Sequence, residues 1–247
     1  MTHKETAHNM KQFRQFAFIF ALWLLWAFIA TPCPMAGTFR DDFEDGDLKG
    51  WRQQYPFAPE PTFWKIVDGE LEGTYLNPAS TTELHIGEEN WKDYTIEFEM
   101  KLLKKFGPGG FCVDARYKNP EWTHFWSVGI GDYPGTWAII AQRFPGNVMT
   151  QKPFDPLELD KWYHIKLEVK GENFTFWVNG KIALEQQDDV VKEGAVGIGL
   201  GNYTGRFDNV EISGPDIPDV TPPTWRASPV QPGGKKAMTW GAIKFSR

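Results

Sequence analysis

The chain has 247 residues, of which 41% are hydrophobic and 15% aromatic, including 12 tryptophans. Its formal net charge is −6 at pH 7, and no sizeable basic cluster follows residue 36, which argues against a nucleic-acid partner. Two cysteines are too few for a disulfide framework, so burial of a core must hold the fold together. The length suits one large domain with tails.

Residues 1–36 have the character of a signal for export. Three basic residues (Lys4, Lys11 and Arg14) precede an uncharged apolar run, Phe16–Ala30, which small residues and prolines follow. We therefore expect a secreted protein, extracellular or periplasmic. The apolar run is shorter than the roughly 20 residues of a comfortable membrane span. An uncleaved signal anchor at residues 16–30 is the alternative, and it is the only membrane contact that the sequence predicts.

The residues from 37 to 214 are expected to form one domain of short strands without helices. An Asp-Gly turn at Asp68–Gly69 predicts a hairpin between Phe63–Val67 and Glu70–Gly73. Further strands are predicted at 81–86, 94–103, 111–117, 123–129 and 136–144, with a turn at 106–110. Regular short strands with glycine and proline turns predict an all-β protein, a two-sheet antiparallel sandwich.

The stretch 161–214 carries the clearest strand signal. In Trp162–Val169 every second residue is apolar (Tyr163, Ile165, Leu167 and Val169), which is the period-two pattern of a strand with one buried face. Asn179–Gly180 favours a type I′ hairpin between Phe174–Val178 and Lys181–Leu184. Two more strands are predicted, at Gly194–Leu200 and Gly205–Ser213.

The order of motifs in this half resembles the concanavalin A-like jelly-roll superfamily of lectins, glucanases and laminin-G-like domains. The motifs are W-x-x-I-x-L from Trp162, F-x-x-W-V-N-G-K from Phe174 and F-D-N-V from Phe207. The spacing of W-x-x-x-D-G-x-L at Trp64–Leu71 and of the strand Gly110–Arg116 is similar to the 3-keto-disaccharide hydrolase type of domain. The resemblance implies a jelly roll and a carbohydrate ligand.

The chain changes character after Gly214. Residues 215–232 hold six prolines and few large apolar side chains, so they are predicted to form an extended linker. Residues 233–247 form a short basic tail that is too small to fold alone. We expect 215–247 to be a proline-rich C-terminal tail, either disordered or used for docking or attachment.

A ligand platform is predicted on the strands between residues 111 and 144. Asp114 and Arg116 alternate with apolar residues and are expected to share a face of their strand, as are Trp122, His124 and Trp126 on theirs. These five residues are predicted to form one open cluster. Aromatic rings and polar side chains together suit a sugar. The predicted ligand-binding residues are Asp114, Arg116, Trp122, His124, Trp126, Trp137 and Arg143. Packing of the tryptophans in the core is the competing interpretation.

Acidic residues at the two ends of the domain predict a structural calcium ion, as in many jelly-roll carbohydrate modules. Hard oxygen ligands suit that ion. The candidate ligands are Asp41, Asp42, Glu44 and Asp208. Hydrogen bonding of these acids to backbone at the sheet edge is the alternative, and no organic cofactor is expected.

Three functions remain open on the sequence. The first is a secreted carbohydrate-binding or cell-surface recognition module. The second is a glycoside-cleaving enzyme of the 3-keto-disaccharide hydrolase or glucanase kind, although Glu97 and Glu99 are better explained as part of an exposed strand face than as a catalytic pair. The third is a structural cell-envelope protein. Paired acids in a groove would favour the enzyme, and an aromatic groove without them the binding module.

Overall fold

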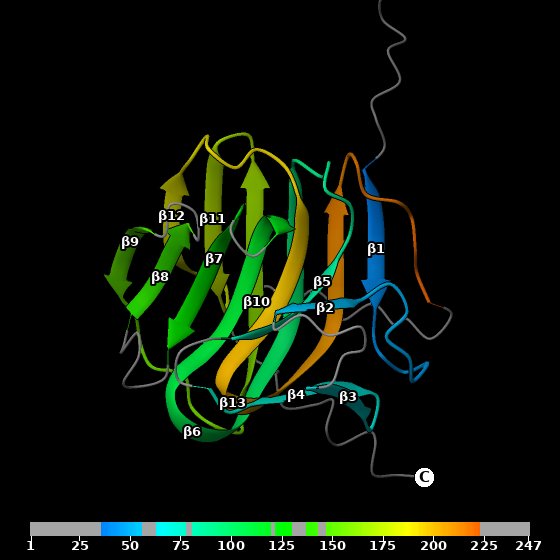
Figure 1. The fold of residues 1–247 in the computed structure, drawn as a ribbon, viewed down its shortest axis with the longest axis vertical. Coiled ribbons are helices and arrows are strands. Elements are labelled where there is room, and N and C mark those ends of the chain that lie inside the picture. The colour runs from blue at the N-terminus through cyan, green and yellow to red at the C-terminus, as the bar shows by residue number, and fades with distance from the viewer. Residues whose placement is uncertain are drawn as a thin grey trace, which may run out of the picture. The chain divides into compact units, whose positions relative to one another are not determined.

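The computed structural model describes residues 36–55, 63–77, 81–119, 122–129, 137–142 and 147–222. The predicted signal segment, the last 25 residues of the predicted tail and Arg143 lie outside these ranges. The described residues form thirteen strands and no helix, so the predicted all-β class is confirmed (Figure 1). Within the described ranges no helix is long and apolar enough to cross a bilayer.

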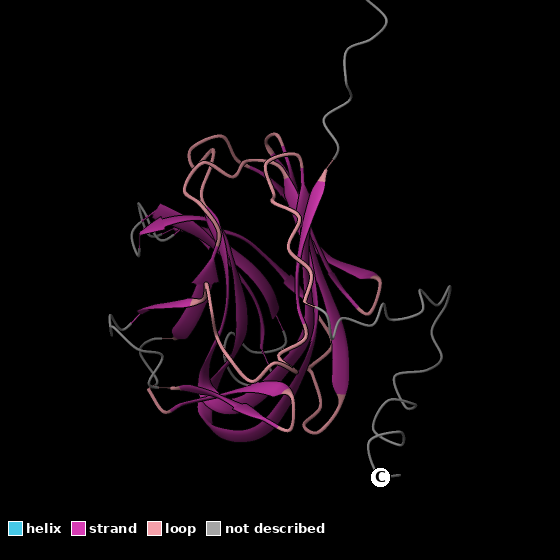
Figure 2. Ribbon diagram, turned by 90° about the vertical axis from the view of Figure 1, so that its right-hand side faces the viewer, coloured by secondary structure: helices cyan, strands magenta, loops and turns pink. Residues whose placement is uncertain are grey.

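Two long strands, β6 (Tyr94–Asn119) and β13 (Ala195–Gly214), run through both layers of a sandwich. Figure 2 shows the two layers from the side. The first sheet joins the amino-terminal half of β6 and the carboxyl-terminal half of β13 to four strands: β1 (Gly37–Asp41), β10 (Trp162–Lys170), β11 (Asn173–Val178) and β12 (Lys181–Gln187). All pairings are antiparallel.

The second sheet joins the other halves of β6 and β13 to five strands. These are β2 (Arg52–Tyr55), β5 (Thr82–Ile86), β7 (Trp122–Gly129), β8 (Trp137–Gln142) and β9 (Asn147–Pro153). The hairpin of β3 (Trp64–Val67) and β4 (Glu70–Tyr75) pairs with β13 where that strand passes between the sheets. Its turn residues Asp68 and Gly69 both have positive φ, as a type I′ turn requires.

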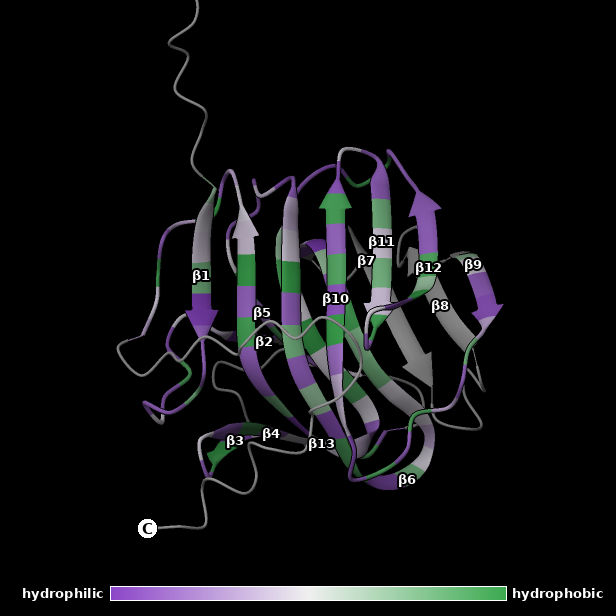
Figure 3. Cartoon of the chain, turned by 180° about the vertical axis from the view of Figure 1, so that it is seen from behind, coloured by the Kyte–Doolittle hydropathy of each residue, from purple (hydrophilic) through white to green (hydrophobic). Residues whose placement is uncertain are grey.

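The core lies between the two sheets. Alternate residues of β10 are buried, and those between them are part-exposed, so the predicted period-two pattern is confirmed. Figure 3 shows the resulting hydropathy stripes on the first sheet. Phe176 of the first sheet meets Phe111 of the second with ring centroids 6.3 Å apart. Burial of such rings is the main stabilising contribution to a domain that has one buried free cysteine, Cys112, among its described residues.

The predicted turn at 106–110 is wrong, because β6 continues through it as a bent strand. The two strands predicted at 194–200 and 205–213 are likewise one strand, β13. At the bend, a Cβ on Gly109 would lie 2.1 Å from the carbonyl oxygen of Gly201. The neighbouring Asn202 has a positive φ, and its Nδ2 donates to the carbonyl of Pro108 at 2.6 Å. Glycine thus allows two strands to bend together rather than ending either of them.

The first part of the predicted proline-rich linker is docked on the sheet. Val220 pairs in parallel with Phe39 of β1, and its N–H donates to the carbonyl of Thr38 at 2.9 Å. Ile217 is buried. Residues 215–222 therefore cover the edge of β1, which would otherwise expose unpaired backbone groups. This pairing was not predicted from the sequence, because a single buried isoleucine among prolines does not have the pattern of a strand.

Candidate functional site

Three neighbouring strands of the second sheet place polar side chains on the face that points away from the core. Gly197 of β13 pairs with His85 of β5 on one side and with Asp114 of β6 on the other. Glu83 pairs with Gly199 two residues along the same strands. The intervening residues of these strands, such as Leu84 and Ile198, belong to the core cluster. The polar residues therefore gather on the outer face of the second sheet.

Two glycines of β13 make room for the side chains beside them. A Cβ on Gly197 would lie 2.4 Å from Cδ2 of His85. A Cβ on Gly199 would lie 2.6 Å from Cγ of Glu83. Contacts this short cannot be made, so only glycine lets the side chains of His85 and Glu83 lie across β13. The G-x-G spacing serves this packing.

Glu83, His85 and Asp114 form a compact cluster, which we call the acid–histidine cluster. Nε2 of His85 is 2.8 Å from Oδ2 of Asp114, and all three side chains are fully buried. One ligand atom from each residue lies within 4.8 Å of the others. The ring of Tyr117 stacks on His85 with centroids 3.6 Å apart. Within the described residues, Nδ1 of His85 has no hydrogen-bond partner.

Two kinds of chemistry suit the acid–histidine cluster. An imidazole and two carboxylates are ligands for a divalent transition metal, whereas calcium prefers oxygen ligands alone. A histidine oriented by a buried carboxylate is also suited to moving a proton as a general base. Burying several ionisable groups is costly, and such groups concentrate where function requires them. The cluster is therefore the candidate functional site.

A bulge in β6 brings Tyr117 to this face. Asp114 pairs with Gly197 and Tyr117 with Ala195, so β6 has one residue more than β13 across the same interval. The extra residue is accommodated at Arg116, whose φ is +54°. Tyr117 therefore lies on the same face as Asp114, where regular alternation would have put it on the opposite one.

The prediction that Asp114 and Arg116 share a face is wrong. The guanidinium of Arg116 donates to the carbonyl of Val191 at 3.0 Å, and also to the carbonyls of Lys92 and Gly171. Its side chain is 3% exposed and lies over the ring of Phe174. Arg116 therefore ties together loops at the end of the sandwich and is not placed to bind a ligand, because the bulge turns it away from Asp114.

The predicted aromatic platform lies on β7 and β8, next to β6 in the second sheet. In the backbone pairing, Phe125 is opposite Asp114, and Trp126 and His124 are opposite Val113 and Ala115. The side chains of Trp122, His124, Trp126 and Trp137, and the whole of Arg143, lie outside the described residues. Their role in binding stays a prediction.

Three of the four predicted calcium ligands, Asp41, Asp42 and Asp208, accept hydrogen bonds from nearby backbone N–H groups. Asp41 accepts from the backbone N–H of Phe43 and from Nε1 of Trp51, both at 2.8 Å. Burial raises the pKa of Asp41 to about 6. Asp208 accepts from its neighbour's N–H. Among the described residues, the group with the spacing of metal ligands is the acid–histidine cluster and not these four acids. The calcium ion stays a prediction.

Glu83 and His85 were not predicted as site residues, although the sequence carries a signal for them. They are two apart in Thr-Glu-Leu-His-Ile, a segment predicted to be a strand, and so share one face. The third member, Asp114, was predicted. What the sequence cannot supply is the pairing of β5, β13 and β6, which brings Asp114 next to His85.

The outer face of the first sheet carries a second polar network. His164 of β10 lies between two carboxylates of β6, with Nε2 3.1 Å from Glu97 and Nδ1 3.2 Å from Glu99. Lys166 forms an ion pair with Glu97 at 2.9 Å. Hydrogen bonds to the two carboxylates raise the pKa of His164 to about 9, and the bond to His164 lowers the pKa of Glu97 to about 2. Glu97 and Glu99 thus lie on the outer face of their strand, as predicted, and both form ion pairs there with residues of β10.

Replacing His164 by glutamine is expected to cost most stability at pH 6 and little at pH 10. The folded-state pKa of about 9 exceeds the unfolded value of about 6.5. The contribution of protonated His164 is therefore complete below pH 6.5 and is lost as the pH rises through 9. Since the pair is part-exposed, the difference should be about 1 kcal/mol or less. Urea unfolding of both proteins between pH 6 and 10 measures it, and a pH-independent difference would contradict it.

Comparison with known proteins identifies the domain. The profile of the 3-keto-alpha-glucoside-1,2-lyase-like domain matches residues 38–213. A levanase of Bacillus subtilis (strain 168) is 31% identical over 158 residues, which are 63% of this chain and 23% of the levanase. The chain thus spans less than a quarter of that relative.

Solved structures share the fold. The carbohydrate-binding module CBM66 from Bacillus subtilis matches with a TM-score of 0.55 and 18% identity, covering 67% of this chain and 96% of the module. A β-glucanase of Bacillus licheniformis matches with a TM-score of 0.51 and 12% identity, covering 72% of this chain and 97% of the enzyme. The predicted concanavalin A-like jelly roll is confirmed, and the chain belongs to the family of 3-keto-alpha-glucoside-1,2-lyase-like domains.

Proposed function

We propose that this protein recognises a carbohydrate on the outer face of the second sheet, at the acid–histidine cluster. The observation that carries the proposal is the gathering of Glu83, His85 and Asp114 on one face of the second sheet, where two glycines make room for the side chains of His85 and Glu83. Carboxylates and imidazole nitrogens accept and donate the hydrogen bonds that sugar hydroxyls need. The carbohydrate-binding module CBM66 has the same fold, which supports this ligand class.

A second candidate function is elimination on a 3-keto-glucoside, and the pairing of His85 with Asp114 favours it. In such a reaction a base removes the proton from C2, which the neighbouring ketone makes acidic. The electron pair forms the C1–C2 double bond, the C1–O bond breaks, and the departing oxygen takes a proton. His85 is the base that the structure offers, because Asp114 orients it through Nε2 at 2.8 Å. Glu83, within 4.8 Å, is the residue placed to supply the proton.

Replacing Asp114 by asparagine is expected to weaken sugar binding about tenfold or more, because a hydrogen bond to a charged group contributes about 1.5–3 kcal/mol. Calorimetric titration with laminarihexaose, xylohexaose and levan oligosaccharides measures it in the full chain. Methyl 3-keto-α-glucoside is the fourth ligand, and NMR follows whether it is bound or converted to the enone with release of methanol.

The matched control for this experiment is Glu211→Gln, because Glu211 forms an ion pair with Arg40 in the first sheet. It should leave binding unchanged. Binding without conversion supports the recognition module, and conversion that Asp114→Asn abolishes supports the enzyme. Failure of all four ligands to bind, or equal binding by Asp114→Asn and the control, would refute the proposed site.

We further propose a bound divalent cation, for which the chain offers two positions. Calcium at Asp41, Asp42, Glu44 and Asp208 should raise the melting temperature, because a ligand of the native state stabilises it by mass action. The Asp208→Asn variant should lose that gain. A gain with zinc or manganese that Glu83→Gln abolishes would assign the ion to the acid–histidine cluster instead. No shift with any of the three ions would end the proposal.

A further inference from the structure

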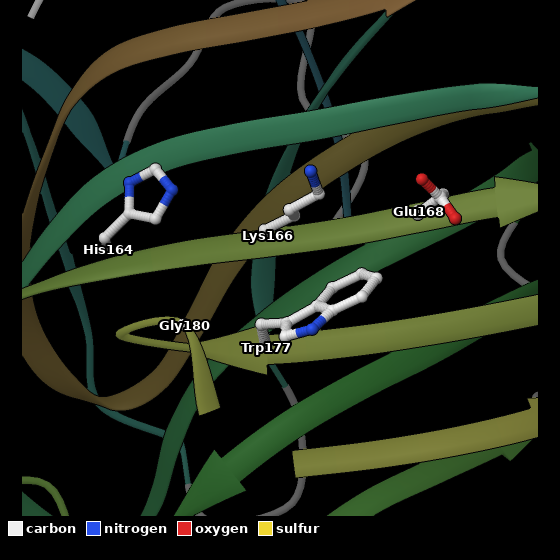
Figure 4. A pocket seen from close by; sticks show the side chains of 5 residues that line it. All are labelled: His164, Lys166, Glu168, Trp177 and Gly180. Carbon is white, nitrogen blue, oxygen red and sulfur yellow. The ribbon is translucent and has the colours of Figure 1, made fainter. Parts of the chain in front are cut away.

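The first sheet has a shallow hollow of about 290 Å³ on its outer face, which we call the Trp177 hollow. Its lining is His164, Lys166 and Glu168 of β10, Trp177 of β11 and Gly180 of the hairpin that follows. Figure 4 shows these side chains on neighbouring strands, with the indole lying beside the row from β10. They alternate with buried residues, so they point away from the core and from the acid–histidine cluster.

The indole of Trp177 is part-exposed and lies on the face of the first sheet that points away from the core. It is paired with Lys166, whose Nζ is 5.5 Å from the ring centroid. On the side of the hairpin, Gly180 leaves open space, since a Cβ there would meet nothing within 4 Å. A ring with an apolar face and a polar N–H, standing in an open hollow, suits a ligand that is itself apolar on one face and polar at its rim.

The polar rim of the Trp177 hollow carries charges of both signs that are already held in place. His164 is fixed between Glu97 and Glu99, and Lys166 is paired with Glu97. Groups ordered in the free protein lose little conformational entropy on binding. Three carboxylates (Glu97, Glu99 and Glu168) lie among two cations, which disfavours an anionic ligand. Neutral hydroxyl groups can donate to the carboxylates and accept from Lys166.

The surface continues along β10 to a second part-exposed tryptophan. Trp162 is on the same face of the strand, with Nζ of Lys101 4.5 Å from its ring centroid. Lys166 is four positions further along β10, which corresponds to a distance of about 13 Å between the two residues along the strand. Two indoles this far apart on one flat face match a chain of sugar rings better than a single ring.

We propose that the Trp177 hollow and the adjoining row toward Trp162 form a second carbohydrate-binding surface, which takes a neutral oligosaccharide. The ligand class rests on the proposed function, but the surface itself does not, because it belongs to the other sheet and shares no residue with the acid–histidine cluster. Two surfaces on one rigid domain would let a single polysaccharide chain, or two chains, be held at once.

The test is an NMR titration of the full chain with laminarihexaose, xylohexaose and levan oligosaccharides. The indole N–H signals of Trp177 and Trp162 are assigned by Trp177→Phe and Trp162→Phe, and the ring signals of His85 and Tyr117 report on the other sheet. We expect at least one sugar to shift the Trp177 signal. Trp177→Ala should weaken that binding about fivefold or more, as for loss of one stacked ring.

Phe106→Ala is the matched control, because Phe106 is also an exposed aromatic with a lysine over its ring, but lies outside the hollow. It should not change binding. Sugars that shift His85 and Tyr117 but never Trp177 would overturn this inference and leave the proposed function standing. Shifts at Trp177 alone would support it and refute the proposed site. A titration in which none of the four reporters moves would refute both.

Discussion

Replacing Arg116 by alanine is expected to lower the free energy of unfolding by about 1.5–3 kcal/mol, as for loss of a hydrogen bond to a charged group. The guanidinium donates to the carbonyl of Val191, which is a buried residue, and to the carbonyls of Lys92 and Gly171, which are exposed residues. Without the guanidinium the carbonyl of Val191 loses this donor, and the ring of Phe174 loses the side chain that lies over it. Urea unfolding of the wild type and the variant measures the loss.

The same substitution should also disturb the acid–histidine cluster at a distance. The backbone N–H of Arg116 donates to the hydroxyl of Tyr94 at 2.6 Å, and the side chain holds the bulge from its other end. Without that side chain β6 can shift its register, which would move Tyr117 from its stack on His85. The ring signals of His85 should then lose the shift caused by the Tyr117 ring, and sugar binding should weaken.

A matched control separates burial from charge. Arg206 likewise has several partners, the carboxylates of Glu70 and Glu72, but its side chain is 20% exposed. Arg206→Ala should cost about 1 kcal/mol or less, because part-exposed ion pairs contribute little. Arg116→Lys keeps the charge without the forked donors and should fall between the two. If Arg116→Ala were no more destabilising than Arg206→Ala, the role given to the three carbonyl contacts would be wrong.

The first sheet could be predicted strand by strand because its two faces differ. In β10 and β11 buried and part-exposed positions alternate, since one face meets the core and the other meets solvent. Apolar and polar residues then follow the same alternation in the sequence. The hairpin at Asn179–Gly180 could be predicted equally well, because both residues adopt the positive φ that their residue types favour.

The strand β5 of the second sheet was harder to interpret because both of its faces are buried. All five residues of β5 are buried, polar ones included, so the sequence shows no contrast between an inner and an outer face. Glu83 and His85 therefore resemble ordinary polar residues of a half-exposed strand. The positions of their side chains depend on Gly197 and Gly199, which are more than 100 residues away in the chain.

The bulge at Arg116 shows a second limit of pattern reasoning. Alternation assumes two residues per repeat, and one extra residue reverses every assignment after it. A positive φ at arginine is uncommon, and the local sequence Asp-Ala-Arg-Tyr does not predict the positive φ of Arg116. Contacts from loops distant in sequence, at Lys92, Gly171 and Val191, determine the conformation. Asp114 precedes the bulge and keeps the alternation that the prediction assumed, whereas Arg116 lies in the bulge and does not.

Replacing Gly197 by alanine is expected to destabilise the protein by about 3 kcal/mol and to abolish binding at the acid–histidine cluster. The added methyl would lie 2.4 Å from Cδ2 and 2.6 Å from Nε2 of His85, so the imidazole must move away from Asp114. Overpacking a buried site costs about 1–3 kcal/mol, and breaking the buried hydrogen bond between His85 and Asp114 adds to it. Thermal and urea unfolding measure the first effect, and the sugar titration measures the second.

Gly205→Ala, on the same strand, is the control for this substitution. Its Cβ would approach no atom closer than 3.2 Å, and that atom is the end of the Leu102 side chain, so a small shift relieves the contact. A double-mutant cycle then identifies the cause. If the clash with the imidazole is the whole effect, Gly197→Ala should cost little in a His85→Ala background, because the methyl would occupy the space that the ring has left. An equal cost in both backgrounds would mean that glycine is needed there for the backbone of β13, and that the position of His85 does not depend on it.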